Sequence, residues 1–166
     1  MKNMTVISNE YMEIVVVLPD IRSTHNVGSI FRTADAAGVK KVFLCGITPQ
    51  PVDQFGRKRQ DISKVALGAE DYIPWEYAQS AVRLIGRLKK EGYMVCAVEQ
   101  SPKSVPYKAF KAPKGAKIAL IIGNEVEGLP MPILARTDVI LEIPMFGKKE
   151  SLNVGVAFGV VVFGLL

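Results

Sequence analysis

The stretch IALIIGNEVEGLP, residues 118–130, decides the fold class of this chain. Its first five residues are apolar without interruption, which is typical of a strand covered on both faces, and Gly123 then ends the run. Such a strand delivers Asn124 and Glu125 to the edge of a sheet, where parallel sheets bind their ligands and where glycine lets a ligand approach the backbone. Taken alone, the stretch favours an ordinary turn with both polar side chains in water. The rest of the chain favours a binding site.

Strand and helix patterns alternate on both sides of this stretch. Apolar runs rich in β-branched residues predict strands at 13–18, 41–45, 93–98 and 139–143. Helical spacing of apolar residues predicts helices at 26–38, 77–91, 132–136 and from 151 onward. Asn26 and Ser151 are the expected N-caps of the first and last of these helices. The alternation predicts an α/β fold with a mostly parallel sheet and helices on both faces, in a single domain spanning 1–166.

The composition bounds the compartment and the partners. The formal charge of +5 favours a polyanionic partner, because surface lysine and arginine displace phosphate counterions. Cys45 and Cys96 each lie in an apolar run without metal-ligand spacing, so we expect buried free thiols and a reducing, cytoplasmic location. Residues 1–12 lack the apolar core of a signal peptide. The apolar run 154–166 is too short to span a bilayer, so we expect no membrane partner and a helix surrounded by protein.

Several common kinds of catalytic site are absent from the sequence. No G-x-G-x-x-G motif follows a strand and no Walker A loop occurs, which disfavours dinucleotide and nucleoside-triphosphate binding by those routes. The chain has one histidine, His25, which we expect in a loop. A histidine-based metal site or a Ser-His-Asp triad therefore has almost nothing to draw on, and no metal is predicted.

A basic segment follows the second predicted strand. In QFGRKRQ, residues 54–60, Arg57, Lys58 and Arg59 stand beside the aromatic Phe55 in a long polar connection. RNA-binding segments combine phosphate contacts and stacking in this way, and long connections in compact domains are usually functional. A loop whose charge only maintains solubility explains the composition equally well.

Three separated segments carry a family resemblance. They are NVGSIFRTA at 26–34, IGNEVEGL at 122–129, and IPMFG at 143–147 followed by SLNVGVA at 151–157. Together they resemble the opening motif, the G-x-E-x-x-G-L motif and the I-P-M…S-L-N-V motif of the SpoU/TrmH family of RNA ribose 2′-O-methyltransferases, within the knotted SPOUT superfamily. The chain carries Gly155 where family members often carry serine, and we expect no effect on the chemistry.

The resemblance implies a fold and a cofactor. The C-terminal helix is expected to thread through a loop to form a trefoil knot, with S-adenosylmethionine bound inside it and a homodimer whose active site lies at the interface. The residues expected to hold the cofactor are Val98, Glu99, Gly123, Ile143 and Leu152. The residues expected to surround the reacting ribose are Arg32, Glu125, Ser151 and Asn153. Asn26, Arg57, Lys58 and Arg59 are expected to contact RNA.

The expected reaction is attack of the ribose 2′-oxygen on the sulfonium methyl group, which requires alignment and removal of a proton. In the family, the arginine is taken as the base. A guanidinium is effectively always protonated, however, so we expect Arg32 to bind the adjoining phosphate and stabilise negative charge on the oxygen. The proton then passes to Glu125, to water or to phosphate.

Other functions stay open from the sequence. Many ribosomal-RNA members carry an additional N-terminal domain, for which 166 residues leave no room, so transfer RNA is the favoured substrate and ribosomal RNA the alternative. A non-catalytic RNA-binding module is disfavoured because Arg32, Glu125 and Asn153 occur together. An enzyme acting on a small nucleotide-like substrate is a further alternative, for which the basic loop would be merely solubilising.

Overall fold

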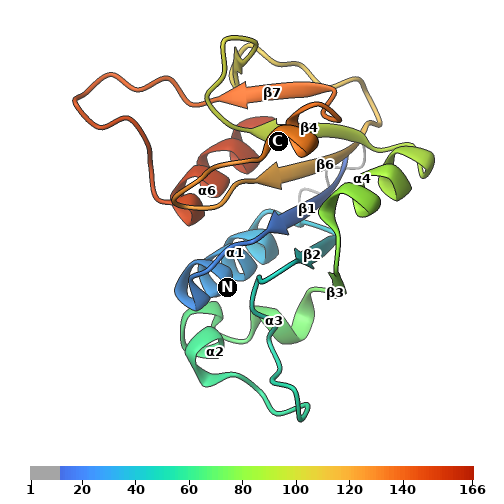
Figure 1. Ribbon diagram of the computed structural model, residues 1–166, viewed down its shortest axis with the longest axis vertical. Coiled ribbons are helices and arrows are strands. Elements are labelled where there is room, and N and C mark those ends of the chain that lie inside the picture. Colours follow the sequence, from blue (N-terminus) through green and yellow to red (C-terminus); the bar gives the residue numbers. More distant parts are fainter. Residues whose placement is uncertain (1–11) are drawn as a thin grey trace, which may run out of the picture.

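Within residues 12–166, which the computed structural model describes, seven parallel strands form a single sheet (Figure 1). In chain order the strands are β1 (Glu13–Pro19), β2 (Lys41–Cys45), β3 (Trp75–Ala78), β4 (Met94–Val98), β5 (Val105–Pro106), β6 (Lys117–Ile122) and β7 (Val139–Glu142). Their order across the sheet is β3-β2-β1-β6-β4-β7-β5, and every neighbouring pair is parallel. The predicted mostly parallel sheet is confirmed.

Helices cover both faces of this sheet, as the sequence predicted. They are α1 (Thr24–Ala36), α2 (Gln60–Ala66), α3 (Ala69–Tyr72), α4 (Ala81–Lys90), α5 (Met131–Leu134) and α6 (Val154–Leu165). Alternate residues of β1 divide between the two cores: Val16 packs with residues of α1, α2 and α6, whereas Val17 packs with residues of α4 and α5. Because side chains of a strand point alternately to opposite faces, an unbroken apolar strand requires this two-sided cover.

The central strands place the important loops. β1 and β6 are neighbours, with Val15 opposite Ala119, and the chain continues from β1 to β2 on one side while β4 and β7 lie on the other. All seven strands point the same way, so the segments that follow them meet at one edge of the sheet. The segment between β7 and α6 extends well away from the sheet before it returns to α6 (Figure 1).

The connection after β2 contains more regular structure than the sequence indicated. Residues Trp75–Ala78 form β3, which pairs with β2, so the helix predicted to begin at residue 77 begins at Ala81 instead. Ser80 caps α4 by accepting a hydrogen bond from the Arg83 backbone nitrogen. Strand pairing in this segment overrides the helical spacing of its apolar residues, because Trp75 and Tyr77 fit a pleated edge strand. Helices α2 and α3 also lie between β2 and β3, in the connection for which the sequence predicted no regular structure.

Both predicted helix caps were wrong. Ser23 caps α1, since its hydroxyl accepts from the backbone nitrogen of Asn26, which leaves Asn26 in the first turn with its side chain free for other contacts. The single histidine, His25, lies in this turn of α1 and not in a loop. Asn153, not Ser151, caps α6, because its side-chain oxygen accepts from the backbone nitrogens of Gly155 and Val156. The predicted caps lie three residues too late for α1 and two residues too early for α6, since helix boundaries inferred from a sequence pattern are imprecise by a few residues.

The C-terminal helix is buried on one face only within this chain. Gly155, Phe158 and Val162 of α6 are buried, whereas Val156 and Phe163 are each 52% exposed. The expectation of a helix surrounded by protein is therefore met on one side. Among residues 12–166, no helix has the length and apolar character needed to cross a membrane.

The two cysteines are free and buried, as predicted. Cys45 belongs to the core under α4, and Cys96 belongs to the core under α1 and α6. They lie on opposite faces of the sheet, which rules out a disulfide between them. Burial raises the pKa of each thiol to about 12, so neither is a nucleophile at neutral pH.

Candidate active site

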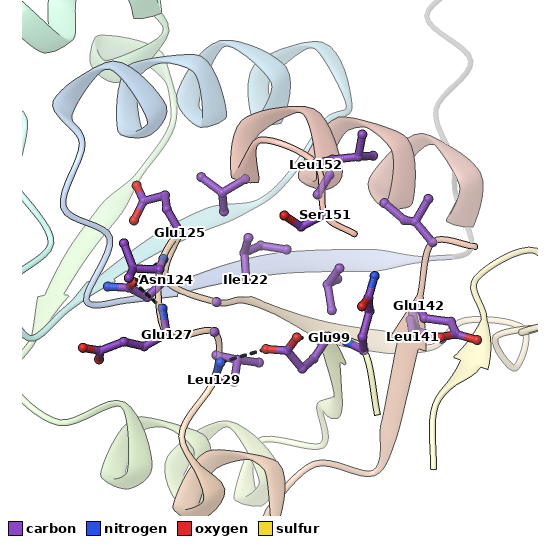
Figure 2. Close-up of a pocket in the computed structure, with 18 of the residues that line it drawn as sticks. Glu99, Ile122, Asn124, Glu125, Glu127, Leu129, Leu141, Glu142, Ser151 and Leu152 are labelled. Carbon is purple, nitrogen blue, oxygen red and sulfur yellow. Dashed lines mark hydrogen bonds between the residues drawn. The ribbon is translucent and has the colours of Figure 1, made fainter. Parts of the chain in front are cut away.

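A pocket of about 450 Å³ opens at the carboxyl ends of β4, β6 and β7, beside the start of α6. It is named here the Gly123 pocket. Its apolar lining includes Val98, Ile122, Leu129, Leu134, Leu141, Ile143, Met145, Leu152, Val154 and Ala157. Figure 2 shows Leu152 and Ser151 on one side of this space and Glu99 and Leu129 across from them. The size and the largely apolar wall are typical of a small-molecule site.

The floor of the Gly123 pocket is the turn that follows β6. Asn124 is buried, and its side-chain oxygen accepts from the backbone nitrogens of Val126 and Glu127 at 2.8 and 3.1 Å. Its side-chain nitrogen donates to the backbone oxygen of Asp20 at 2.6 Å. One buried amide therefore shapes the turn and ties it to the end of β1.

Gly123 is required by the shape of the same turn. A Cβ atom at this position would lie 3.0 Å from the carbonyl carbon of Gly128 and 3.1 Å from the backbone nitrogen of Leu129. The turn folds back over Gly123 so closely that a side chain there would push the turn outward by a few tenths of an ångström. The glycine thus serves the packing of the turn that forms the pocket wall.

Glu99 holds the other end of the turn in place. One carboxylate oxygen accepts from the backbone nitrogen of Leu129 at 2.9 Å, and the other accepts from that of Gln100 at 2.9 Å. The side-chain nitrogen of Gln100 in turn donates to the backbone oxygen of Glu150 at 2.5 Å. The segment after β4 therefore links the turn after β6 with the segment that leads into α6, and so fixes two walls of the pocket.

Three side chains from distant parts of the sequence form a hydrogen-bonded cluster at one end of the pocket. Asn26 is 6% exposed, and its side-chain nitrogen donates to Glu125 Oε1 at 2.9 Å. Its side-chain oxygen accepts from Asn153 Nδ2 at 3.0 Å. The predicted RNA contact Asn26 is thus an internal bridge between two predicted catalytic residues.

Glu125 is held as a carboxylate by the N-terminus of α1. Partial burial alone would raise its pKa, but the hydrogen bonds from the Asn26 side chain and from the backbone nitrogens of Arg22 and Ser23 lower the pKa below its ordinary value. Backbone N–H groups at a helix N-terminus favour negative charge in this way. A carboxylate with a lowered pKa is a weak base, so Glu125 is better suited to orienting its neighbours than to accepting a proton.

The Gly123 pocket is acidic although the chain is basic. Its charged lining residues are Glu99, Glu125, Glu127 and Glu142, and no lysine or arginine contributes to the lining among residues 12–166. Glu125 and Glu127 lie at one end of the pocket in Figure 2, and Glu142 lies at the other. A small ligand with a positively charged centre and an apolar surface fits this combination best.

The structure brings most of the predicted site residues together. Val98, Glu99, Gly123, Glu125, Ile143, Ser151 and Leu152 line the Gly123 pocket. Asn26 and Asn153 contact Glu125 directly or through each other. Arg32 does not line the pocket: it is exposed on α1, six residues or about 9 Å of helix beyond Asn26. Its side chain forms no hydrogen bond or ion pair with any other residue of the described chain.

The basic segment after β2 also lies away from the Gly123 pocket, and its charges are paired. Arg57 Nε contacts Asp53 at 2.8 Å, and Arg59 contacts Asp61 at 2.9 Å. Lys58 contacts both Asp71, at 2.6 Å, and the buried Glu70, at 3.1 Å. The segment is an ordered turn closed by an antiparallel bridge between Val52 and Lys58, not a flexible loop.

Sequence interpretation missed several residues of the site, and two of them, Asn124 and Glu127, lie in the turn after β6. The sequence offers either a solvated turn or a binding edge for Asn124, and neither interpretation predicts that this side chain is buried and organises the turn. Glu127 lines the pocket and pairs with Arg22 at 3.5 Å. The available signal was the position of Asn124 immediately after an apolar strand, since an asparagine side chain commonly bonds the backbone two residues further on.

Comparison with known proteins agrees with this geometry. A sequence profile described as the SpoU rRNA Methylase family matches residues 13–163. The chain is 33% identical over 149 residues to the 23S rRNA (guanosine-2'-O-)-methyltransferase RlmB of Neisseria meningitidis serogroup B, which covers 90% of this chain and 56% of that protein. The chain thus spans little more than half the length of this relative.

Solved structures share the fold. The crystal structure of an AdoMet-bound rRNA methyltransferase from Sinorhizobium meliloti superimposes with a TM-score of 0.81 and 30% identity, covering 92% of this chain and 55% of that one. A structure reported for the 2-OH methylation of C/U34 on tRNA superimposes with a TM-score of 0.72 and 26% identity, covering 92% and 93% of the two chains. Because the family profile spans nearly the whole described sequence, the chain belongs to the SpoU rRNA Methylase family.

Proposed function

We propose that this protein transfers a methyl group from S-adenosylmethionine to the 2′-oxygen of a ribose in RNA, with transfer RNA as the substrate. When bound, S-adenosylmethionine supplies a methyl group on a positively charged sulfur, which leaves as a neutral thioether when the 2′-oxygen attacks. The names of longer relatives state 2'-O-methylation of rRNA for one and bound AdoMet for another, and the proposal carries the reaction and the methyl donor over to this chain.

The acidic, apolar Gly123 pocket is the observation that carries the proposal. Its volume of about 450 Å³ suits a nucleoside-sized cofactor, its apolar wall suits an adenine ring, and its four glutamates suit a cation. Gly123, Ile143 and Leu152 would hold the cofactor through their backbones and the surrounding apolar surface. The absence of a side chain at Gly123 lets the backbone of Gly128 and Leu129 close over it and form this wall of the pocket.

The cluster of Asn26, Glu125 and Asn153 would orient the reacting ribose at the end of the pocket. Asn26 and the N-terminus of α1 hold Glu125 ionised, and Asn153 is fixed by its capping of α6. The lowered pKa of Glu125 favours water or an RNA phosphate as the final proton acceptor. Ser151, at the pocket wall, would contact the ribose or the cofactor.

Arg32 would act in the active site of a second copy of the chain. In its own chain it lies outside the pocket with its guanidinium unpaired among the described residues, which suits a side chain that meets its partner only in a dimer. The half-exposed Val156 and Phe163 on α6, together with Leu152, provide an apolar surface for that dimer. There Arg32 would bind the phosphate next to the reacting ribose and stabilise negative charge on its oxygen.

The close packing of α6 supports a trefoil knot at the C-terminal end of the fold. A Cβ atom at Gly155 would lie 3.0 Å from the Ser29 hydroxyl, and one at Gly164 would overlap the Tyr107 ring. Glycines at both ends of α6 thus allow the helix to lie tightly between α1 and the segment after β5. Such packing is expected of a helix that is enclosed by loops of the same chain.

Transfer RNA is the preferred substrate within the proposal, and ribosomal RNA is the second candidate. The structure that concerns methylation of tRNA matches over 93% of its length, whereas the match to the Neisseria enzyme for 23S rRNA covers 56% of that protein. The net charge of +5 favours either RNA. With RNA as the substrate, we expect the protein in the cytoplasm.

Methyl transfer from tritiated S-adenosylmethionine to unfractionated transfer RNA and, separately, to ribosomal RNA tests the proposal. The expected product is a 2′-O-methyl nucleotide in transfer RNA, identified after nuclease digestion by its resistance to alkaline cleavage. An Asn153→Ala variant with an unchanged circular dichroism spectrum should lose this activity. Label on a base, or no transfer to either RNA, would refute the assignment.

A further inference from the structure

A second pocket, of about 490 Å³, lies beyond the carboxyl ends of β2 and β3. It is named here the Phe55 pocket. The residues that define its character are Ile47, Gln50, Phe55, Arg57, Arg59 and Tyr77. It shares a sheet edge with the Gly123 pocket but has no residue in common with it. The segment that forms it extends away from α6, in the lower part of Figure 1.

The Phe55 pocket exposes an unusual amount of aromatic and apolar surface. Phe55 is 71% exposed, Ile47 is 65% exposed and Tyr77 is 40% exposed. A single exposed apolar side chain is ordinary, but three that line one hollow form a surface suited to a flat apolar ligand. The basic side chains Arg57 and Arg59 line the same hollow.

Hydrogen bonds hold the turn that carries Phe55 and the ring of Tyr77 in place. Asp53 Oδ1 accepts from the backbone nitrogens of Phe55 and Arg57 at 2.8 and 2.9 Å, which fixes the turn that carries Phe55. The hydroxyl of Tyr77 donates to the backbone oxygen of Gly46 at 3.0 Å, which fixes the second ring. Because the turn and the Tyr77 ring are already ordered, less conformational entropy would be lost when a ligand binds.

Arg57 combines a ring contact with spare hydrogen-bond donors. Its guanidinium lies 5.0 Å from the centre of the Phe55 ring, and its Nε atom contacts Asp53. Its two terminal nitrogens form no hydrogen bond with residues 12–166. A phosphate next to a base stacked on Phe55 would therefore find two donors in the fork geometry that phosphates favour.

Short hydrogen bonds fix the Phe55 pocket relative to the Gly123 pocket. Asp20, at the end of β1, accepts from the backbone nitrogen of Ile47 at 3.1 Å through its carboxylate and from Asn124 at 2.6 Å through its backbone oxygen. The hydroxyl of Thr48 donates to Leu18 and accepts from the backbone nitrogen of Ile21. An RNA strand that occupied both pockets would therefore meet two binding sites at a constant separation.

We propose that the Phe55 pocket binds an unstacked base of the RNA strand, from a nucleotide near the one that is methylated, with the adjoining phosphate on Arg57. This inference rests on the proposed function, because it assigns a second contact of the same substrate. Aromatic stacking of splayed bases beside arginine–phosphate contacts is how proteins recognise single-stranded RNA. The pocket would thus select substrates whose target nucleotide lies in a loop.

Binding of a fluorescein-labelled oligoadenylate of about twelve nucleotides by fluorescence anisotropy tests the inference. Phe55→Leu keeps an apolar side chain but removes the ring, and should weaken binding about 5- to 100-fold at every salt concentration. Arg57→Gln should weaken binding too and, unlike Phe55→Leu, should reduce the steepness of log affinity against log salt by about 0.7. Tyr72→Leu, which removes a 77% exposed ring outside the pocket, is the matched control and should bind as the parent does.

A duplex of oligoadenylate with oligouridylate separates stacking from general attraction to RNA. Its bases are already stacked, so Phe55→Leu should leave its affinity unchanged. Equal affinity of the parent and Phe55→Leu for the single strand, or equal losses on single strand and duplex, would overturn the inference. Methyl transfer by the parent is assayed separately, so failure of that transfer would refute the proposed function while the binding data still decide the Phe55 pocket.

Discussion

Asn26 and Asn153 lie 127 residues apart in the sequence, and the side-chain nitrogen of Asn153 donates a 3.0 Å hydrogen bond to the side-chain oxygen of Asn26. The other half of the Asn26 amide donates to Glu125. Because Asn26 lies in the first turn of α1 and Asn153 caps α6, their hydrogen bond joins two helix N-termini beside Glu125. The geometry of the candidate site therefore depends on the amide of Asn26.

Asn26→Asp should strongly reduce methyl transfer. The carboxylate can still accept from Asn153, but it loses the donor to Glu125 and places a second negative charge beside it. Since a hydrogen bond to a charged group contributes about 1.5–3 kcal/mol, kcat/KM should fall about 10- to 100-fold. Affinity for S-adenosylmethionine, measured by calorimetry, should change little, because Asn26 does not line the pocket. A variant with the parent's turnover would show that the bridge is dispensable.

Arg32→Ala and Asn153→Ala should complement each other. If Arg32 serves the partner's site, a mixed dimer carries one site with both residues intact and one with neither. After denaturation and refolding of an equal mixture, about a quarter of the parental activity should return, since half of the dimers are mixed and half of their sites are complete. Each variant refolded alone is the control. Activity no greater than the mean of the two controls would place Arg32 in its own chain's site.

Glu125→Gln should change how stability depends on pH. The pKa of Glu125 is lowered below 4.5 in the folded protein, so its stabilising effect is present above pH 4.5 and is lost as the pH falls through the folded-state pKa. Urea unfolding should therefore show the variant less stable than the parent at neutral pH, with the difference shrinking in acid. A difference that grows in acid would mean that the folded protein favours the protonated carboxyl.

Gly28→Ala should destabilise the protein, whereas Gly86→Ala should not. A Cβ atom at Gly28 would lie 2.7 Å from the Ile62 carbonyl oxygen and 2.9 Å from the Val65 Cβ, which forces α1 and α2 apart at a cost of about 1–3 kcal/mol. Gly86 lies on the exposed side of α4 with open space around it, so alanine should stabilise by about 0.5–1 kcal/mol. Unfolding midpoints in urea would measure both. Equal effects of the two substitutions would contradict the close contact of α1 with α2.

The native protein should not react with thiol reagents at pH 8. Cys45 and Cys96 are buried, and burial raises the pKa of each to about 12, so almost no thiolate is present. Absorbance after addition of an aromatic disulfide reagent should show negligible release before denaturation and two thiols per chain after it. Rapid labelling of the folded chain would indicate local opening of the sheet.

The fold class could be predicted because strands buried on both faces have an unmistakable pattern. The run at Ile118–Ile122 within β6 and the β-branched run of β1 have no polar residue that could face solvent, so helices had to cover both sides. The strand at Trp75–Ala78 could not be predicted, because four partly exposed residues gain their structure from pairing with β2. Pairing partners are a property of the whole fold, and local spacing does not contain them.

The pocket-lining residues were easier to predict than the roles of the residues around them. Gly123, Glu125 and Leu152 follow strands or precede helices within motifs, so their positions at the sheet edge could be inferred from the sequence. The burial of Asn26 could not, because it depends on contacts with residues 99 and 127 positions further along the chain. The paired charges of Arg57 and Arg59 depend similarly on how the turn closes around Asp53 and on the start of α2.

The link between Asn26 and Asn153 also determines when the site can form during synthesis. Translation adds roughly 5–20 residues per second, so α1 and β1 leave the ribosome well before the last helix has been made. Until then the hydrogen-bonded cluster of Asn26, Glu125 and Asn153 is incomplete. In addition, β1 must pair with β6 across about a hundred residues of intervening chain, which is a slow step for parallel strands. A nascent chain that has not yet reached α6 therefore lacks the complete site, and any methylation begins only after α6 has been translated.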